Sequence, residues 1–296
     1  MSILIAPATA RTNTFVISAL LASPSPPPLC LLARSDASRA RLEAAYAGNA
    51  NVSVIVADFL DPPALRAAMD GVRSVFYNAP VFEQEERAGK NVVDAAKAAR
   101  VEKFVYCSLM HPYVKRLIHH RTKLEIEEYL FESDLSYTIL QPTHLMQNIS
   151  VADALETGRL PIPWSATITH GFLDLTDLGA VAASVLLAPP AAHAYARYEL
   201  CAVNATYVDV GRILTEAAKK EIKVVNAEKE KALQGMTATG RIGDSEYVQG
   251  TLRKMMVYYD ERGLPGCPNV LRWLLGREPT TLEGFIAREV KAAELK

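Results

Sequence analysis

The chain has 296 residues, of which 50% are hydrophobic and 22% are charged, a composition that predicts a sizeable buried core and excludes a disordered chain. Its 32 basic and 33 acidic side chains leave a formal net charge of -1, which predicts no direct binding to nucleic acid or to an anionic membrane surface. The sequence has no apolar run of about 18 residues, so it predicts no transmembrane helix. Its four cysteines form no CxxC pair, which argues against a zinc site and predicts reduced thiols in a cytoplasmic protein.

The first 150 residues alternate strand-like and helix-like segments with short connections. Apolar runs of strand character cover residues 3–6, 29–33, 52–57, 74–77, 104–108 and 137–140. Helices are expected between them, at residues 14–21, 38–46, 62–69, 83–100 and 121–133. This alternation predicts βαβ units and a parallel sheet covered by helices on both faces. We therefore expect a Rossmann-like, doubly wound α/β core over residues 1–150.

The regular alternation ends after residue 150. A loop interrupted by prolines and glycine is expected first, followed by a helix, a strand and a series of helices. The expected segments are a loop around Pro161, Pro163, Trp164 and Gly171, helices at 175–187, 207–219, 224–233, 247–262, 268–275 and 282–291, a strand at 197–202 and a turn at 235–243. We expect residues 151–296 to complete the sheet and to form a smaller, mostly helical lobe over the carboxyl ends of the strands, where such folds bind ligands.

The first connection has the layout of a dinucleotide-binding turn without the glycines of that turn. Those three glycines allow a tight turn, a close approach to the pyrophosphate and close packing of helix on strand. A seven-residue turn is expected here, and its first, fourth and seventh positions hold Pro7, Ala10 and Asn13. The start of the following helix still offers N–H groups to a phosphate. The candidate side chains at this turn are Thr9, Arg11, Thr12 and Asn13. The sequence leaves two interpretations of this turn open: an altered phosphate-binding site, or a turn with a purely structural role.

Further candidate cofactor residues follow other strands. Arg34 comes directly after the second strand, where a basic residue is typical of a site for the 2′-phosphate of NADP. Asp58 follows the third strand and could reach the adenine amino group, while Asn78, Ala79 and Pro80 would run beside a ribose. The structural alternatives are a solvated arginine at a strand end and an aspartate that only shapes its turn.

A basic segment after the fifth strand carries the strongest indication of chemistry. His119 and Lys123 are four residues apart, which places them on one face of a helix. Lys123 could orient a nicotinamide ribose and His119 could donate a proton, although a solvated basic patch would have the same composition. The segment predicts no metal site, because no carboxylate stands at ligand spacing from the histidines. After the sixth strand, Pro142, His144 and Asn148 belong to a run expected to line the nicotinamide side of the cleft.

Several segments resemble the NmrA-like, isoflavone-reductase-like branch of the atypical short-chain dehydrogenases. They are residues 3–21 and 58–61, HHRTKLEIEEYLFESDLSYTILQPTHLMQN, GFLDLTDLGAVAASVLL and YYDERGLPGCPNVLRWLLGREPTTLEGFI. The resemblance implies a Rossmann-like sheet, NADP or NAD in its cleft and a substrate under the C-terminal lobe. It also implies either a reductase of quinones, phenylpropanoids or other secondary metabolites, or a dinucleotide sensor that regulates transcription factors. The chain departs from the family in its missing glycines and in Gln141, where arginine is common.

The sequence as a whole predicts an NADPH-dependent reductase that transfers a hydride to a small aromatic, quinone or carbonyl metabolite, with Lys123 and His119 as catalytic candidates. Two alternatives stay open. A non-catalytic NADP-sensing regulator is favoured because a histidine replaces the tyrosine that typical short-chain dehydrogenases carry four residues before the lysine. A cofactor-free isomerase or cyclase is favoured by Pro7 and Asn13. NAD is the second cofactor candidate. The expected partners are a small-molecule substrate and either a second copy of the chain or a regulatory protein.

Overall fold

The computed structural model describes residues 2–79, 83–238 and 243–295. The chain forms two compact units, each assembled from separate stretches of sequence. The first comprises Met1–Lys115, His120–Gln141 and Leu178–Tyr198, and the second comprises Arg116–His119, Pro142–Asp177 and Glu199–Lys296. The first unit therefore takes up a stretch from beyond residue 150. No helix within the described ranges is both long enough and apolar enough to cross a membrane.

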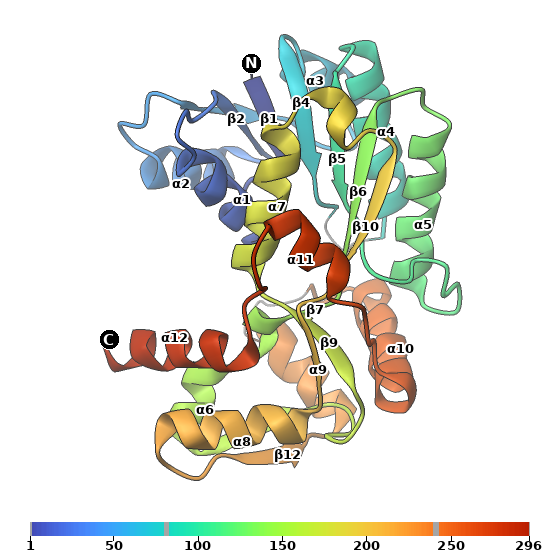
Figure 1. Cartoon of the computed structure of the whole chain (residues 1–296). Helices are drawn as coiled ribbons and strands as arrows, with labels where there is room; N and C mark the ends of the chain where they lie inside the picture. Colours follow the sequence, from blue (N-terminus) through green and yellow to red (C-terminus); the bar gives the residue numbers. More distant parts are fainter. Residues whose placement is uncertain (1, 80–82, 239–242, 296) are drawn as a thin grey trace. The chain divides into compact units, whose positions relative to one another are not determined.

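The first unit is built on a sheet whose seven described strands lie in the order β10-β6-β5-β4-β1-β2-β3 (Figure 1). The order reverses between β1 and β4, and in such sheets ligands bind at the carboxyl ends of the strands beside that reversal. β1 pairs in parallel with both β2 and β4, and the register places Ala6 opposite Tyr77. The predicted doubly wound α/β fold is confirmed. The strands are β1 (Ser2–Ala6), β2 (Leu29–Ala33), β3 (Val52–Val56), β4 (Val72–Tyr77), β5 (Lys103–Cys107), β6 (Tyr137–Pro142) and β10 (Ala196–Leu200).

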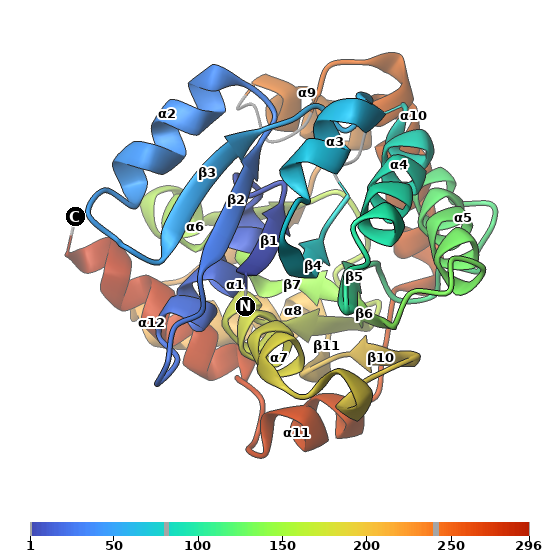
Figure 2. The ribbon, with the colours of Figure 1, turned by 90° about the horizontal axis from the view of Figure 1, so that it is seen from above.

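Helices cover both faces of this sheet (Figure 2). On one face, apolar side chains of α3, α4 and α5 share a hydrophobic core with the strands. On the other face, α7 approaches α1 so closely that a Cβ on Gly179 would lie 2.7 Å from the carbonyl oxygen of Phe15. Glycine is therefore required at that crossing. The helices named so far, with α2, are α1 (Arg11–Leu21), α2 (Asp36–Ala45), α3 (Pro62–Ala68), α4 (Glu85–Ala98), α5 (Ile118–Phe131) and α7 (Leu175–Leu187).

The second unit combines short strands with helices around a core of its own. One small sheet has the order β11-β9-β7, and β8 pairs with β12 in parallel. Among the helices, α12 packs against α8 and α6. The elements are β7 (His144–Leu145), β8 (Arg159–Ile162), β9 (His170–Leu173), β11 (Val203–Ala205), β12 (Lys223–Asn226), α6 (Val151–Thr157), α8 (Tyr207–Ala218), α9 (Lys229–Ala238), α10 (Glu246–Arg262), α11 (Asn269–Leu275), α12 (Leu282–Glu294) and the 3-10 helix η1 (Met146–Asn148).

Two expectations for this part of the chain are wrong. The expected loop around Pro161 and Gly171 contains β8 and β9, and the stretch expected to be helical from residue 224 begins as β12. Val224 of β12 packs directly over Gly211, where a Cβ would lie 2.4 Å from its side chain. Pairing with β8 and packing on α8 therefore override the local helical preference of this polar stretch.

Candidate functional site

The turn after β1 is shorter than its sequence suggests. α1 begins at Arg11, because the N–H groups of Asn13 and Thr14 already donate to the carbonyl oxygen of Ala10, at 2.9 and 3.1 Å. The expectation of a seven-residue turn with a helix from residue 14 is therefore wrong, and only residues 7–10 connect β1 to α1. The peptide bond between Ala6 and Pro7 is cis.

Asn13 replaces the last glycine of the usual motif and holds the turn together. Its side chain is fully buried, and its Nδ2 donates to the carbonyl oxygen of Pro7 at 2.8 Å. The N–H of Ala8 donates to the carbonyl oxygen of Leu32 at 2.9 Å, which ties the same turn to β2. The amide of Asn13 thus supplies a contact within the turn at a position where a glycine would supply only close packing.

The start of α1 presents polar groups outward. Thr9 and Arg11 are exposed and Thr12 is half-buried. The N-cap residue, Ala10, makes no side-chain capping bond, so the first N–H groups of the helix have no side-chain acceptor from it. An uncapped helix start is a favourable place for an anion, because the N–H groups and the helix dipole both favour negative charge.

The carboxyl ends of the neighbouring strands bring other predicted residues to the same edge of the sheet. Arg34 is exposed and directly follows β2. The N–H of Asn78 donates to the carbonyl oxygen of Ala6 at 3.0 Å, which joins the ends of β4 and β1. Asp58, after β3, is exposed and its carboxylate accepts the N–H of Leu60 at 2.9 Å, so it shapes its own turn. Pro80 lies outside the described residues.

Lys123 is held in a buried ion pair behind this edge. Its Nζ lies 3.0 Å from Oε1 of Glu85, and the two side chains are only 3% and 1% exposed. The same Nζ donates to the carbonyl oxygen of Ala79 at 2.9 Å and lies 5.7 Å from the centre of the Tyr106 ring. Lys123 therefore links α5 to α4 and to the segment that leaves β4.

Sequence reasoning missed Glu85, although a signal for it exists. Glu85, Ala88 and Val92 follow helical spacing and all three are buried in α4. An acidic residue on the apolar stripe of a helix requires a buried partner, because an unpaired buried carboxylate is strongly destabilising. Lys123 is that partner, and it stands on the buried face of α5 in the same way.

A second buried carboxylate lies one helical turn beyond Lys123. Glu127 is fully buried and accepts from Nε2 of Gln141, at 2.9 and 3.2 Å for its two oxygens. The guanidinium of Arg197 lies 3.8 Å from one of these oxygens. Burial raises the pKa of Glu127, and the hydrogen bonds from Gln141 and the charge of Arg197 only partly oppose that effect. Sequence reasoning singled out Gln141 for its departure from the family but missed the carboxylate it contacts.

The remaining predicted residues belong to the second unit. His119 is half-buried in the first turn of α5, one turn before Lys123, as the spacing predicted. Pro142 is the last residue of β6, and Asn148 is exposed at the end of η1. Their roles toward a cofactor or substrate stay predictions.

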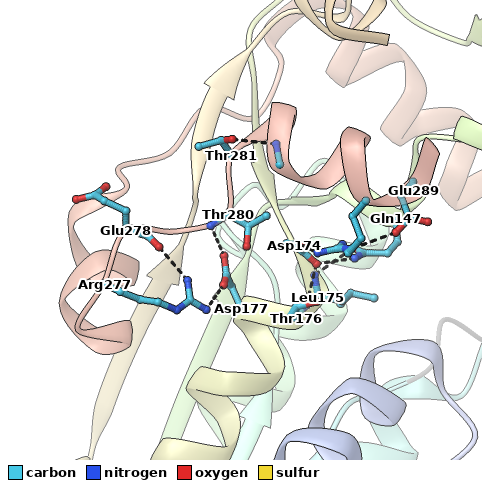
Figure 3. Close-up of polar contacts among 12 residues, drawn as sticks. Gln147, Asp174, Leu175, Thr176, Asp177, Arg277, Glu278, Thr280, Thr281 and Glu289 are labelled. Carbon is cyan, nitrogen blue, oxygen red and sulfur yellow. Dashed lines mark hydrogen bonds and ion pairs between the residues drawn. The ribbon is translucent and has the colours of Figure 1, made fainter. Parts of the chain in front are cut away.

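Two buried aspartates at the start of α7 connect it to other segments of the second unit (Figure 3). Asp174 accepts from the N–H of Thr176 at 2.9 Å and from Nε2 of Gln147 at 2.7 Å, and it forms an ion pair with Arg288 at 2.8 Å. Burial opposes ionisation of Asp174, but the bonds from these three partners outweigh it and lower the pKa of the carboxyl. Gln147 also accepts the N–H of Leu175 at 3.1 Å, so this cluster fixes the start of α7.

Asp177 makes the matching connection to the segment before α12. Its two oxygens accept from Nη2 of Arg277 and from the N–H of Thr280, both at 2.7 Å, and its side chain is fully buried. Asp177 therefore holds the FLDLTD segment to the REPTT segment (Figure 3), and Asp174 joins FLDLTD to Arg288 of α12. The partners named here for both aspartates lie within the second unit.

Two curated proteins with similar sequences are both named as reductases or oxidoreductases. Quinone oxidoreductase 2 of Escherichia coli (strain K12) is 26% identical over 279 residues, which cover 93% of this chain and 94% of that protein. NAD(P)H azoreductase of Xenophilus azovorans is 28% identical over 193 residues, which cover 64% of this chain and 66% of that protein.

Solved structures give the same result for the fold. The NADPH-dependent quinone oxidoreductase of Escherichia coli, complexed with NADPH, superposes with a TM-score of 0.80 at 25% identity and covers 98% of this chain and 99% of that one. The negative transcriptional regulator NmrA superposes with a TM-score of 0.77 at 16% identity, covering 100% of this chain and 98% of that one, a likeness of fold alone. The model of the NmrA-like family matches residues 1–286. The chain belongs to the NmrA-like family.

Proposed function

We propose that this chain binds NADPH and uses it to reduce a small aromatic, quinone or carbonyl compound. The observation that carries the proposal is the placement of Arg34, exposed and directly after β2. In Rossmann-like folds, a basic side chain at that point pairs with the 2′-phosphate that distinguishes NADPH from NADH. The uncapped start of α1 also supports the proposal. This helix follows β1, the strand beside β2, and its first N–H groups suit a pyrophosphate.

The residues at this edge of the sheet fit a dinucleotide in distinct ways. Arg11 and Thr9 are exposed donors at the start of α1, and Asn78 follows the strand that pairs with β1. A bound NADPH would supply the hydride. Lys123 would act as a positioning residue, since its ammonium fixes the Ala79 carbonyl and with it the segment expected beside a ribose. His119 is our candidate for the proton donor.

The names of the relatives support the acceptor class. Escherichia coli quinone oxidoreductase 2 aligns with 93% of this chain. The azoreductase aligns with only 64% of this chain, so it supports mainly the proposal that the chain uses NAD(P)H. Quinones and azo compounds are both flat, conjugated acceptors that take up two electrons and protons, which defines the panel to be tested.

One observation favours a second candidate, an NADP-binding sensor that carries out no reaction. The Lys123 side chain is 3% exposed, and its ammonium contacts the Glu85 carboxylate and the Ala79 carbonyl. A lysine held in this way fixes structure, and His119 replaces the tyrosine that typical short-chain dehydrogenases place one turn before it. Both features are compatible with binding a dinucleotide without transferring a hydride.

The test is a titration of the purified full chain with NADPH and with NADH. Binding is measured by calorimetry and by the transfer of fluorescence energy from tryptophan to the reduced nicotinamide. Saturable NADPH binding, tighter than NADH binding, is expected. The NADPH-bound protein is then mixed with quinones and azo dyes while NADPH absorbance is recorded. Oxidation of NADPH supports the reductase, whereas binding without oxidation of NADPH by any acceptor supports the sensor. Failure to bind either dinucleotide at millimolar concentration contradicts both and leaves the cofactor-free alternative.

A further inference from the structure

The second unit contains a groove between three of its helices, which we call the α6–α12 groove. Its lining comes from α6 and the residues just before it, from the last turns of α12 and from the end of α8. α12 packs against both of the other helices (Figure 1). The groove has a volume of about 660 Å³, which is in the range of small-molecule sites. The described residues that line it include none of those proposed above for the dinucleotide.

The floor of the α6–α12 groove is apolar. Ile149, Val151 and Val290 line the groove and are themselves buried, so they form its floor. Leu155 of α6 lines the groove as well and is half-buried. A chain of methylene groups that covers these side chains removes apolar surface from water on both sides of the contact, which is favourable. The floor therefore suits an aliphatic segment of a ligand.

The walls of the groove carry an excess of negative charge. Asp153 and Glu156 line it from α6, where a spacing of three residues places them on one face of the helix. Glu289 and Glu294 line it from α12. Lys220 is the single cation among the described lining residues, so four carboxylates and one ammonium give the lining a formal charge of -3. The groove therefore favours a ligand with several positive charges.

The groove already binds an aminobutyl group that belongs to the chain itself. Lys220, just beyond α8, lines the groove, and its Nζ donates to the carbonyl oxygen of Leu155 in the last turn of α6. Two more helices end here, α8 at Ala218 and α12 at Glu294. Carbonyl groups in the last turn of a helix have no partner within the helix and carry partial negative charge, so they accept well from a cation. Further ammonium groups on short methylene chains therefore find the same kind of acceptor as Lys220 does.

We propose that the α6–α12 groove binds a linear polyamine with three ammonium groups, the class to which spermidine belongs. Its three positive charges match the formal charge of -3 on the lining, and its methylene segments cover the apolar floor. A compact trication would meet the carboxylates without covering the floor, and a neutral alkyl chain would do the reverse, so the two features together select a polyamine. The inference goes beyond the proposed function, since the groove lies within the second unit and binding to it requires no dinucleotide.

The experiment titrates the full chain, without dinucleotide, with three trications of different shape. Spermidine is a linear amine, hexaamminecobalt(III) is a compact ion without methylene groups, and acetyl-trilysine amide is a peptide. We expect calorimetry at low salt to show saturable binding of one spermidine per chain, at least about tenfold tighter than either of the other two. The affinity for spermidine should fall as sodium chloride is added, because salt screens the ion pairs.

Matched charge variants then locate the site. Replacing two wall carboxylates together, Glu156→Gln with Glu294→Gln, should weaken spermidine binding by about fivefold or more. The control, Glu261→Gln with Glu283→Gln, removes two exposed carboxylates that do not belong to the lining and lowers the net negative charge by the same amount. It should change the affinity by less than about twofold.

A last variant tests the shape of the groove without changing its charge. Ala292 lines the groove and is exposed, so Ala292→Phe places a ring over the apolar floor without disturbing the core. Spermidine should then bind about fivefold more weakly or worse.

Three results would overturn the proposal. They are no spermidine binding at millimolar concentration, equal affinities for the three trications or equal losses in the two pairs of charge variants, and tighter binding of the peptide than of spermidine. The second result would mean that cations bind to acidic surface in general, and the third would assign the groove to a protein partner. None of these measurements involves NADPH, so the polyamine site and the proposed reductase activity can each fail while the other holds.

Discussion

Lys123 and Glu85 form an ion pair of almost completely buried side chains, 3.0 Å apart, and the lysine also donates to the Ala79 carbonyl. The pair joins two helices to the segment that leaves β4. Burying two charges is unfavourable unless each is well compensated, so this ion pair adds little to the net stability of the fold. Its main effect is to fix how the two helices and the segment after β4 are placed.

The losses of stability caused by removing each partner of this pair should not be additive when both are removed. Lys123→Met leaves the Glu85 carboxylate without its cation, and Glu85→Gln leaves the lysine without its anion, so each should reduce the free energy of unfolding by about 3–5 kcal/mol. The double variant should lose clearly less than the sum. Urea unfolding of the four proteins measures the coupling. Additive losses would mean that the two charges do not depend on each other.

Arg34→Ala should separate the two dinucleotides. If Arg34 pairs with the 2′-phosphate, its loss removes a charge-assisted hydrogen bond, typically about 1.5–3 kcal/mol, from NADPH binding only. NADPH affinity should then fall by about tenfold or more while NADH affinity changes little. Arg41→Ala, which removes an exposed arginine from α2, is the matched control and should change neither. Equal losses for both dinucleotides would contradict the assignment of Arg34.

Asp177→Asn should weaken the connection between the start of α7 and the segment before α12. The substitution removes the charge that meets Arg277 and disturbs the bond from the Thr280 N–H, both at 2.7 Å. Hydrogen bonds to a charged group contribute about 1.5–3 kcal/mol, and we expect a loss of that size in urea unfolding. Glu278→Gln is the control, because the Glu278 side chain is 73% exposed and its pair with Arg272 should contribute little. Similar stabilities of the two variants would show that Asp177 does not carry the connection.

The sheet could be predicted from sequence because its strands are short apolar runs separated by clear helix starts. α3 is the plainest example, since Asp61 caps it and Pro62 opens it, as proline at a first helical position suggests. β12 could not be predicted, because Lys223–Asn226 becomes a strand only by pairing with β8, a contact between distant parts of the chain. Local preference carries no information about such a partner.

The candidate site was predictable in part for the same reason. Arg34 and Asn78 follow apolar strands, so their place at the edge of the sheet follows from the strands alone. The partners of Lys123 and Gln141 were not predicted. These partners, Glu85 and Glu127, are acidic residues on helices, and such residues are usually solvated. Asn13 was expected to face a cofactor, and its Nδ2 instead donates to the Pro7 carbonyl, a contact that depends on how tightly the turn closes.

Glu127→Gln should make the stability of the protein less dependent on pH. Burial raises the pKa of Glu127 above its usual 4.5, so the folded state retains its proton to higher pH than the unfolded state does. The stabilisation from that carboxyl is complete below the unfolded pKa and is lost as the pH rises through the folded pKa. Glutamine keeps an oxygen that can accept from Gln141 and does not ionise. Urea midpoints at about pH 4.5 and about pH 8 should therefore show the variant gaining on the natural protein as the pH rises. Glu128→Gln, at the exposed neighbouring position of α5, should show no such gain. A difference between Glu127→Gln and the natural protein that stays constant with pH would mean that Glu127 ionises alike in the folded and unfolded chain.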